Sequence, residues 1–188
     1  MPERQRKVRA DARRNYEKLV VAAESAFAEQ GSETSLEGIA QRAGVSIGTL
    51  YAHFPHRRAL ISAVLATRNQ ALFDAAHTLP DDPHAALVRW VHMVVDHVAS
   101  YQGLATMLAD GVDDAASELH SACLRMTEIC ERLVVDAARS GAVQAGVTGA
   151  DLFAIANAAA WSREHATRDQ ADRLLELMLA GTTAEPRR

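Results

Sequence analysis

The stretch that decides the fold covers residues 36–54, LEGIAQRAGVSIGTLYAHF. Apolar residues recur at helical spacing on both sides of Gly44, and Ala40 is small where a second helix would have to cross the first. Gly44 can adopt the left-handed backbone that a tight turn between two short helices requires. Val45 and Leu50 are spaced to fill the wedge between the helices. The pattern predicts a helix-turn-helix motif.

The second helix of this motif, about residues 46–53, exposes small and hydrogen-bonding side chains. A helix of this kind fits the major groove of DNA. We expect DNA contacts from Ser46, Ile47, Gly48, Thr49, Tyr51 and His53. Gly48 costs about 1 kcal/mol relative to alanine within a helix, which close approach to DNA or to a neighbouring helix would explain. The alternative for Tyr51 and His53 is partial burial as packing residues.

Basic residues flank the motif. Arg57 and Arg58 open the next helix, where the helix dipole does not favour cations, so phosphate contact is the better rationale. We expect further phosphate-facing side chains on the preceding helix at Arg13, Arg14 and Lys18. Residues 1–70 hold 11 Lys and Arg against 7 Asp and Glu, whereas residues 71–188 hold 9 against 17. A basic N-terminal part on an acidic body is consistent with a protein that binds nucleic acid.

The whole chain reads as all-α, because period-2 alternation is absent and Ala, Leu, Arg and Glu dominate. We expect about nine helices, including 8–29, 35–43, 46–53, 57–77, 84–101, 104–108, 114–140, 150–163 and 168–180. Four capping pairs or single caps support these bounds, namely Thr34 with Glu37, Ser46, Thr148 with Asp151, and Thr167 with Gln170.

The predicted organisation has four parts. Residues 1–7 form a disordered basic arm, residues 8–56 a DNA-binding domain and residues 57–78 a connecting helix. The linker LPDDP at residues 79–83 begins a helical second domain, which covers residues 79–188. The chain has 48% hydrophobic and 23% charged residues, as is usual for a globular protein, and we find neither a long apolar run nor a secretory signal. We therefore expect a cytoplasmic, nucleoid-associated protein that does not engage a membrane.

Two segments resemble a known family. Residues 40–54, AQRAGVSIGTLYAHF, resemble the signature of the tetracycline-repressor (TetR) family of transcriptional regulators. Residues 22–31, AAESAFAEQG, are similar to the family's first helix and its terminal glycine. The resemblance is specific across about residues 13–65. Beyond that it depends on the number of helices and on residues 174–181, LLELMLAG, which resemble the family's last helix.

Within the family, residues 9–15 and 47–51 are most similar to the SbtR-like branch of actinobacterial regulators. The resemblance implies a homodimer built through the last two helices, with two recognition helices one turn of DNA apart on a palindromic operator. It also implies a phosphate contact from Thr34 through its cap, operator contacts from Thr49 and Tyr51, and a phosphate-binding role for Arg57. Arg58 departs from the family, where an acidic residue is common.

The resemblance further implies a repressor that a small effector releases from DNA. Such an effector acts only if it binds one spacing of the two DNA-reading heads better than the other. Apolar side chains of the central helices with a few polar groups predict a largely apolar ligand. The candidate lining residues are Trp90, Met93, Val94, His97, Leu104, Met107, Leu108, Met126, Phe153, Asn157 and Trp161, and the alternative for each is a place in the core.

Other functions have less support. We find no nucleophile elbow, phosphate loop, dinucleotide fingerprint or zinc-spaced Cys/His set, so we expect no catalytic site, no metal site and no cofactor. Two pairs, His92 with Asp96 and His120 with Cys123, are each too few to bind a metal. Cys123 and Cys130 lie about 10 Å apart along one helix, too far for a disulfide, and are interpreted as core residues, with a thiol sensor as the alternative. An effector-free DNA-binding protein and a helical enzyme with a cryptic site remain as alternative functions.

Overall fold

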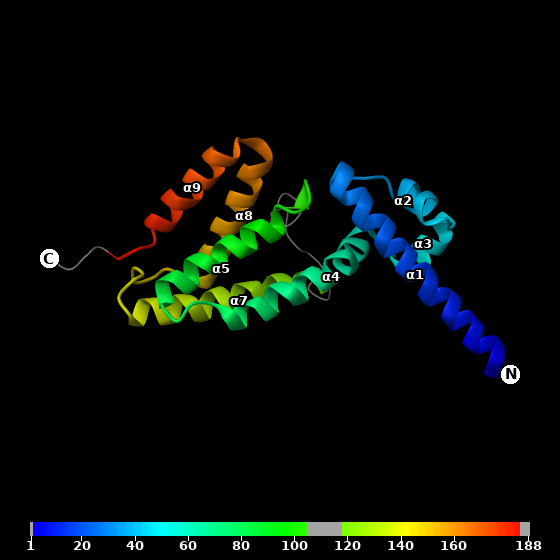
Figure 1. Cartoon of the computed structure of the whole chain (residues 1–188), viewed down its shortest axis with the longest axis horizontal. Helices are drawn as coiled ribbons and strands as arrows, with labels where there is room; N and C mark the ends of the chain where they lie inside the picture. Colours follow the sequence, from blue (N-terminus) through cyan, green and yellow to red (C-terminus); the bar gives the residue numbers. More distant parts are fainter. Residues whose placement is uncertain (1, 105–117, 185–188) are drawn as a thin grey trace. The chain divides into compact units, whose positions relative to one another are not determined.

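The computed structural model describes residues 2–104 and 118–184, except the side chains of residues 2–5, 7, 8 and 118. The helices in these ranges are α1 (Pro2–Gln30), α2 (Leu36–Ala43), α3 (Ile47–His53), α4 (Arg57–Ala75), the 3-10 helix η1 (Ala76–Thr78), α5 (Pro83–Val98), α7 (Glu118–Arg139), α8 (Gly149–His165) and α9 (Arg168–Ala180) (Figure 1). The one β feature described is an isolated bridge between Val143 and Thr183. The predicted all-α fold is confirmed.

The chain divides into two compact units, Met1–Thr67 and Arg68–Arg188, and the division falls inside α4. The first unit holds α1, α2, α3 and the start of α4. The second holds the end of α4, η1, α5, α7, α8 and α9. Each unit has its own buried apolar side chains, as expected of separate helical layers.

Helix α1 begins at Pro2, so residues 2–7 are helical rather than the disordered arm that we expected. Proline is well tolerated at a first helical position, and the Glu, Arg, Gln and Lys residues that follow are good helix formers. Leu19, Ala23 and Phe27 lie at helical spacing on the buried face of α1. The helix ends as predicted at Gly31, which has φ +80° and donates its N–H to the Phe27 carbonyl.

The second unit is a helical bundle in which α8 packs against α5, α7 and α9 (Figure 1). Trp90, Leu152 and Leu175 are among its fully buried side chains, and small residues of α8 such as Ala156 allow close helix approach. The Thr148 side chain and Asp151 form the predicted capping box of α8. Thr167 caps α9 by accepting the Gln170 N–H, also as predicted.

Several helix bounds differ from the expected ones. Helix α5 ends at Val98, because its C-cap Ala99 and the residues after it turn rather than continue the helix. Asp82 caps α5, with Pro83 in its first turn. The predicted short helix at 104–108 and the start of the predicted helix at 114–140 lie outside the described residues, apart from Leu104. Among the described helices, none is long and apolar enough to cross a membrane.

Candidate nucleic-acid interface

The α2–α3 motif has the geometry that its sequence predicts. Helix α2 ends at Gly44, whose φ of +69° and ψ of +34° are left-handed. The Val45 N–H donates to the Ala40 carbonyl at 3.0 Å and closes the turn. Ile39 and Ala40 are buried beneath α3, and Leu50 anchors α3 with its side chain fully buried. Glycine is needed at position 44 because a Cβ at this φ is strained.

Helix α3 is held by its cap and presents one face outward. The Ser46 side chain accepts the Thr49 N–H at 3.1 Å, and the Ser46 and Thr49 hydroxyls lie 2.9 Å apart. Gly48 is exposed, and a Cβ built on it would meet only the Ser46 Oγ, at 3.9 Å. A neighbouring helix therefore does not require this glycine. Ile47 and Thr49 are half-buried.

Tyr51 and His53 differ in their surroundings. The Tyr51 side chain is 46% exposed and lies on the outer face of α3. His53 is half-buried, and its ring meets Tyr16 of α1 edge-on at 6.1 Å between centroids. Tyr16 also packs against Phe54 at 5.1 Å. Partial burial therefore applies to His53, whereas Tyr51 is available to a partner.

Thr34 does not cap α2, contrary to our expectation. Ser35 is the N-cap, and its side chain accepts the Gly38 N–H at 3.3 Å. The Thr34 hydroxyl points into the fold and donates to the carbonyls of Gly31 and Ala26 at 2.9 and 3.3 Å. Two adjacent capping residue types made the choice ambiguous from sequence. The burial of Thr34 in the α1–α2 turn decides it.

Arg57 braces this same turn. Its Nη1 donates to the Ser32 carbonyl at 2.7 Å and to the Thr34 carbonyl at 2.5 Å. The side chain is half-buried, so it stabilises the junction between α1, α2 and α4. Arg58 is also half-buried and engaged within the protein. These two residues are less accessible to phosphate than the sequence suggested.

The basic residues of α1 are exposed. Arg13 donates to Glu17 at 2.8 Å, and this hydrogen bond raises the pKa of the Arg13 guanidinium. Arg14 pairs with Asp11 at 3.2 Å, and Lys18 is exposed. Exposed pairs of this kind are weak, so the arginine side chains can exchange these partners for phosphate oxygens at little cost.

Sequence reasoning missed two contacts that position the motif. Tyr16 contacts the end of α3, and its place three residues before Leu19 on α1 was an available signal. Arg42 of α2 makes a two-pronged ion pair with Glu29 of α1, at 3.0 and 2.7 Å. No local pattern indicates that pair, because the partners are 13 residues apart.

In the second unit, most of the proposed effector-pocket residues pack as core. Val94 and Met126 are buried, as is Leu104 beyond α5, and Trp90 is buried with its indole N–H donating to the Cys130 sulfur at 3.2 Å. Met93 and Phe153 are half-buried against the same core. Met107 and Leu108 lie outside the described residues.

Three polar or aromatic members of that set have distinct surroundings. His97 is buried, and its burial, with a smaller contribution from the charge of Arg68, lowers the pKa of its imidazole to about 4. The Asn157 Oδ1 is buried and finds no hydrogen-bond partner among the described residues. Trp161 is 48% exposed and stacks on His165 at 4.0 Å.

The cysteine thiols are partly or fully buried, and Asp96, the residue paired with His92 in the sequence, forms an ion pair with Arg163. Burial raises the pKa of both the Cys123 and the Cys130 thiol to about 11, which disfavours the reactive thiolate. Asp96 accepts a hydrogen bond from Arg163, which also donates to Asp172 of α9. Arg163 thereby joins α5, α8 and α9. The described part of the chain contains no group of three or more His, Cys, Asp or Glu residues arranged to hold a metal.

Two family models of transcriptional regulators match successive parts of the chain. The family model "Bacterial regulatory proteins, tetR family" matches residues 19–64, and "Transcriptional regulator SbtR-like, C-terminal domain" matches residues 82–184. The HTH-type transcriptional regulator SrpR of Pseudomonas putida is 38% identical over 68 residues, which are 36% of this chain and 32% of that protein. The chain thus spans about a third of the length of this curated relative.

Solved structures extend the likeness to both units. The TetR transcriptional regulator SCO0520 from Streptomyces coelicolor is 30% identical, with a TM-score of 0.60, over 91% of this chain and 99% of that one. RolR in complex with its ligand resorcinol has a TM-score of 0.65 at 18% identity, over 94% and 91% of the two chains, which shows the fold alone.

Proposed function

Because the chain belongs to the TetR family of bacterial transcriptional regulators, we propose that it binds a palindromic operator through α3 and represses the adjacent genes. A bacterial regulator of this kind acts on the chromosome in the cytoplasm. In this proposal α3 enters the major groove. Gly48, Thr49 and Tyr51 face the base edges, while Ser46, Ile47 and His53 lie at the margins of the contact.

One observation carries this proposal. Helix α3 is fixed on one face by the buried Leu50 and, at its end, Phe54. Its opposite face offers Gly48, Tyr51 and Ala52 to solvent. A helix anchored on one face, with Gly48 and Ala52 exposed on the other, can approach the edges of base pairs closely, as direct readout requires.

Phosphate contacts would fix the register of this helix. We assign them first to Lys18, Arg13 and Arg14, which are exposed on α1. Thr34, Arg57 and Arg58 are assigned a supporting role, because the first two hold the α1–α2 turn and Arg58 is engaged within the protein. Phosphate contacts add affinity without sequence preference and make binding salt-dependent.

We propose that two copies associate through α8 and α9. These helices carry exposed apolar side chains, including Leu177 at 69%, Trp161 at 48% and Leu174 at 39% exposure. Large apolar residues on adjacent helices support burial against a second copy. A two-fold dimer presents two α3 helices to the two halves of a palindrome.

We further propose that a small, largely apolar effector binds in the second unit and releases the DNA. Of the lining residues predicted from the sequence, Asn157 with its unpartnered Oδ1 and His97 with its neutral imidazole are the two that offer a buried polar group to such a ligand. The fold neighbour RolR binds resorcinol, and a ligand of similar size and polarity suits the mostly apolar set proposed here. Within this set, the side chains of Trp90 and Val94 are fully buried.

The test is binding of the purified chain to DNA flanking its own coding region across a salt series. Tyr51→Ala removes an exposed ring from the outer face of α3 without touching the core, so we expect operator affinity to fall at least ten-fold. Wild-type binding should weaken steeply with salt, with a slope of about −0.9 per phosphate contact.

Leu124→Ala serves as the matched control, because it removes an exposed apolar side chain from α7 in the other unit. It should leave DNA affinity unchanged. If the flanking DNA contains no operator, one can be found by selection from random sequences. Equal affinity of wild type and Tyr51→Ala for that operator would contradict the assignment of α3 as the reading helix.

A further inference from the structure

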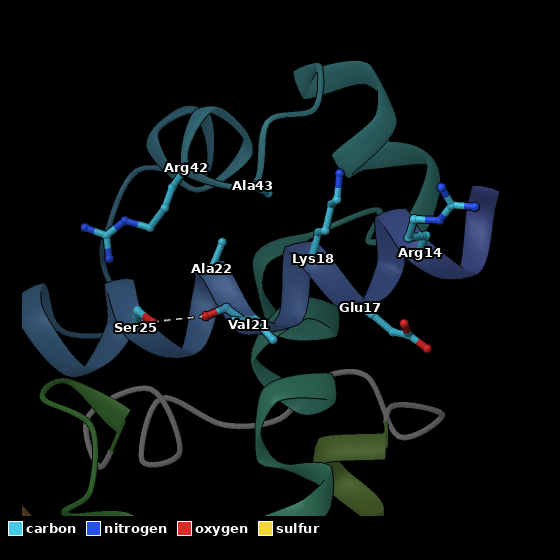
Figure 2. A pocket seen from close by; sticks show the side chains of 8 residues that line it. All are labelled: Arg14, Glu17, Lys18, Val21, Ala22, Ser25, Arg42 and Ala43. Atoms are coloured by element: carbon cyan, nitrogen blue, oxygen red, sulfur yellow. Dashed lines mark hydrogen bonds between the residues drawn. The ribbon is translucent and has the colours of Figure 1, made fainter. Parts of the chain in front are cut away.

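The first unit contains a groove between α1 and the end of α2, and two of its lining residues, Arg14 and Lys18, are ones assigned above to phosphate contacts (Figure 2). Its volume is about 480 Å³. Small-molecule sites in proteins occupy roughly 300–1,000 Å³. The groove is therefore large enough for an organic ligand, and it is separate from the effector region proposed in the second unit.

The middle of the groove is apolar. Ala22 of α1 and Ala43 of α2 line it with small side chains, and Val21 lies beside them with 64% of its side chain exposed. A single exposed valine is ordinary on a protein surface. Here it borders a hollow whose other apolar lining residues, Ala22 and Ala43, are only 6% and 8% exposed, so a ligand in the groove would remove mainly the Val21 side chain from water.

The ends of the groove are cationic. Arg14 and Lys18 lie at one end and Arg42 at the other, whereas Glu17 is the single acidic lining residue. In Figure 2 the Arg14 and Lys18 side chains extend to the side of α1 that faces α2, and Glu17 extends to the opposite side.

These cations differ in how far they are neutralised. Arg42 is held by both carboxylate oxygens of Glu29, and Arg14 pairs with Asp11 at 3.2 Å. The Lys18 ammonium has no ion-pair partner among the described residues. The unneutralised charge thus lies next to the apolar middle of the groove.

We infer that this groove binds an amphipathic organic anion. Its carboxylate or sulfonate would meet Lys18 and Arg14, and its apolar body would cover Val21, Ala22 and Ala43. A neutral apolar ligand would gain nothing from the charges of Lys18 and Arg14. An inorganic anion would leave the apolar middle exposed, so neither matches the lining as well.

Occupation of the groove has a consequence for DNA binding. Lys18 and Arg14 are also assigned to phosphate contacts, so ligand and DNA would compete for the same cations. This consequence rests on the proposed function, whereas binding of the anion itself does not. Binding of an organic anion in the groove would therefore lower the affinity of this unit for DNA.

The test uses the full chain with ¹³C-labelled Ala and Val methyl groups and 8-anilinonaphthalene-1-sulfonate as the probe. We expect saturable shifts of the Val21, Ala22 and Ala43 methyl signals. Lys18→Gln should weaken this binding by up to about five-fold, the upper end for one exposed ion pair. Val21→Glu places a negative charge, the same sign as that of the probe, in the groove and should weaken probe binding more than ten-fold. This change is measured from the methyl signals of Ala22 and Ala43.

Ala12→Glu is the matched control, because it adds the same charge at an exposed α1 position that does not line the groove. It should leave the shifts unchanged, and circular dichroism should show all three variants folded. Shifts confined to methyl groups of residues 68–184 would overturn the inference. Equal binding of the neutral analogue N-phenyl-1-naphthylamine at the same methyls would also overturn it.

The same methyl signals are also followed during titration with a DNA duplex of arbitrary sequence. If Ala22 and Ala43 respond to the duplex at low salt and not to the probe, the groove is part of the phosphate contact and the inference is wrong. Because the probe titration contains no operator, its outcome is independent of whether sequence-specific DNA binding is found.

Discussion

At Gly48, helix stability and the proposed function make opposite demands. It lies inside a seven-residue helix, where glycine is unfavourable, and no neighbouring side chain needs the space of its missing Cβ. An external surface that approaches α3 closely would explain its presence. That surface is DNA in the proposed function.

Replacing Gly48 with alanine should therefore stabilise the protein and impair DNA binding. We expect a gain of up to about 1 kcal/mol in the free energy of unfolding, because alanine is the better helix former. Operator affinity should fall at least ten-fold, because the added methyl group would lie between α3 and the DNA. Chemical denaturation and a DNA titration measure the two effects.

Gly38 offers a matched control in α2. It is exposed, and its Cβ would meet only the Ser35 Cβ, at 3.9 Å. Gly38→Ala should stabilise the protein similarly and leave DNA affinity unchanged. If Gly48→Ala binds the operator as well as wild type, close approach is not the reason for the glycine.

His97 couples the stability of the second unit to pH. Its burial lowers the pKa of the imidazole from 6.5 to about 4. Between these two values the unfolded chain binds a proton at His97 that the folded chain does not. The free energy of unfolding should therefore fall as the pH is lowered from about 6.5 to about 4, with a contribution from His97 of about 3 kcal/mol.

His97→Gln should remove that contribution, which urea unfolding at a series of pH values would measure. His165→Gln is the control, since His165 is exposed. A decline between pH 6.5 and 4 that is as steep in His97→Gln as in wild type would show that other groups cause it.

At the level of elements, two junctions determine how the helices meet. In the first unit, the α1–α2 turn is tied to α4 by Arg57, which donates to the Ser32 and Thr34 carbonyls. The Thr34 hydroxyl secures the same turn from inside. These bonds connect α1 to the start of α4, so residues expected to touch phosphate also hold the α2–α3 motif in place.

In the second unit, α7 and α8 approach each other at Gly149. A Cβ at this position would lie 2.3 Å from the backbone nitrogen of Glu131, closer than any real contact allows. The Gly149 N–H also donates to the Glu131 carboxylate. Gly149→Ala should therefore separate the two helices and destabilise the protein by roughly 2–4 kcal/mol.

Thermal unfolding would measure this loss as a clear drop in Tm. The same substitution at Gly38, a helical glycine with open space around it, should raise the Tm slightly. A Gly149→Ala protein as stable as wild type would mean that α7 and α8 can move apart without loss of packing.

At the scale of the whole molecule, the two units differ in charge and in the side chains that they expose. The first is basic and carries α3, the helix proposed to read DNA, while the acidic second unit carries exposed apolar residues on α8 and α9. Palindrome recognition requires two copies, because one seven-residue helix reads only a half-site. Operator affinity should thus depend on residues far from the DNA.

Leu177→Glu should convert the proposed dimer to a monomer, because it places a charge among the exposed apolar side chains of α9. Light scattering after size exclusion measures the mass, and we expect operator affinity to fall more than 100-fold with helix content unchanged. Leu124→Glu makes the same change at an exposed position of α7 and should remain dimeric. A monomeric wild type, or a dimeric Leu177→Glu, would place the interface elsewhere.

The local pattern of the sequence determined much of the fold. Helical periodicity, the glycine stops at Gly31 and Gly44, and the caps at Ser46, Thr148 and Thr167 depend on residues within a few positions of one another. Such short-range chemistry is readable from the chain, and so were the helix-turn-helix and its exposed Tyr51.

Only the tertiary structure decided how separate segments share those residues. It turned Thr34 inward and made Ser35 the cap, joined Arg42 to Glu29, placed Tyr16 against His53, and opened the groove between α1 and α2. Each of these depends on which side chain meets which backbone across the fold. The sequence determined which residues could bind or cap, and packing determined which of them are already occupied and which remain free for a partner.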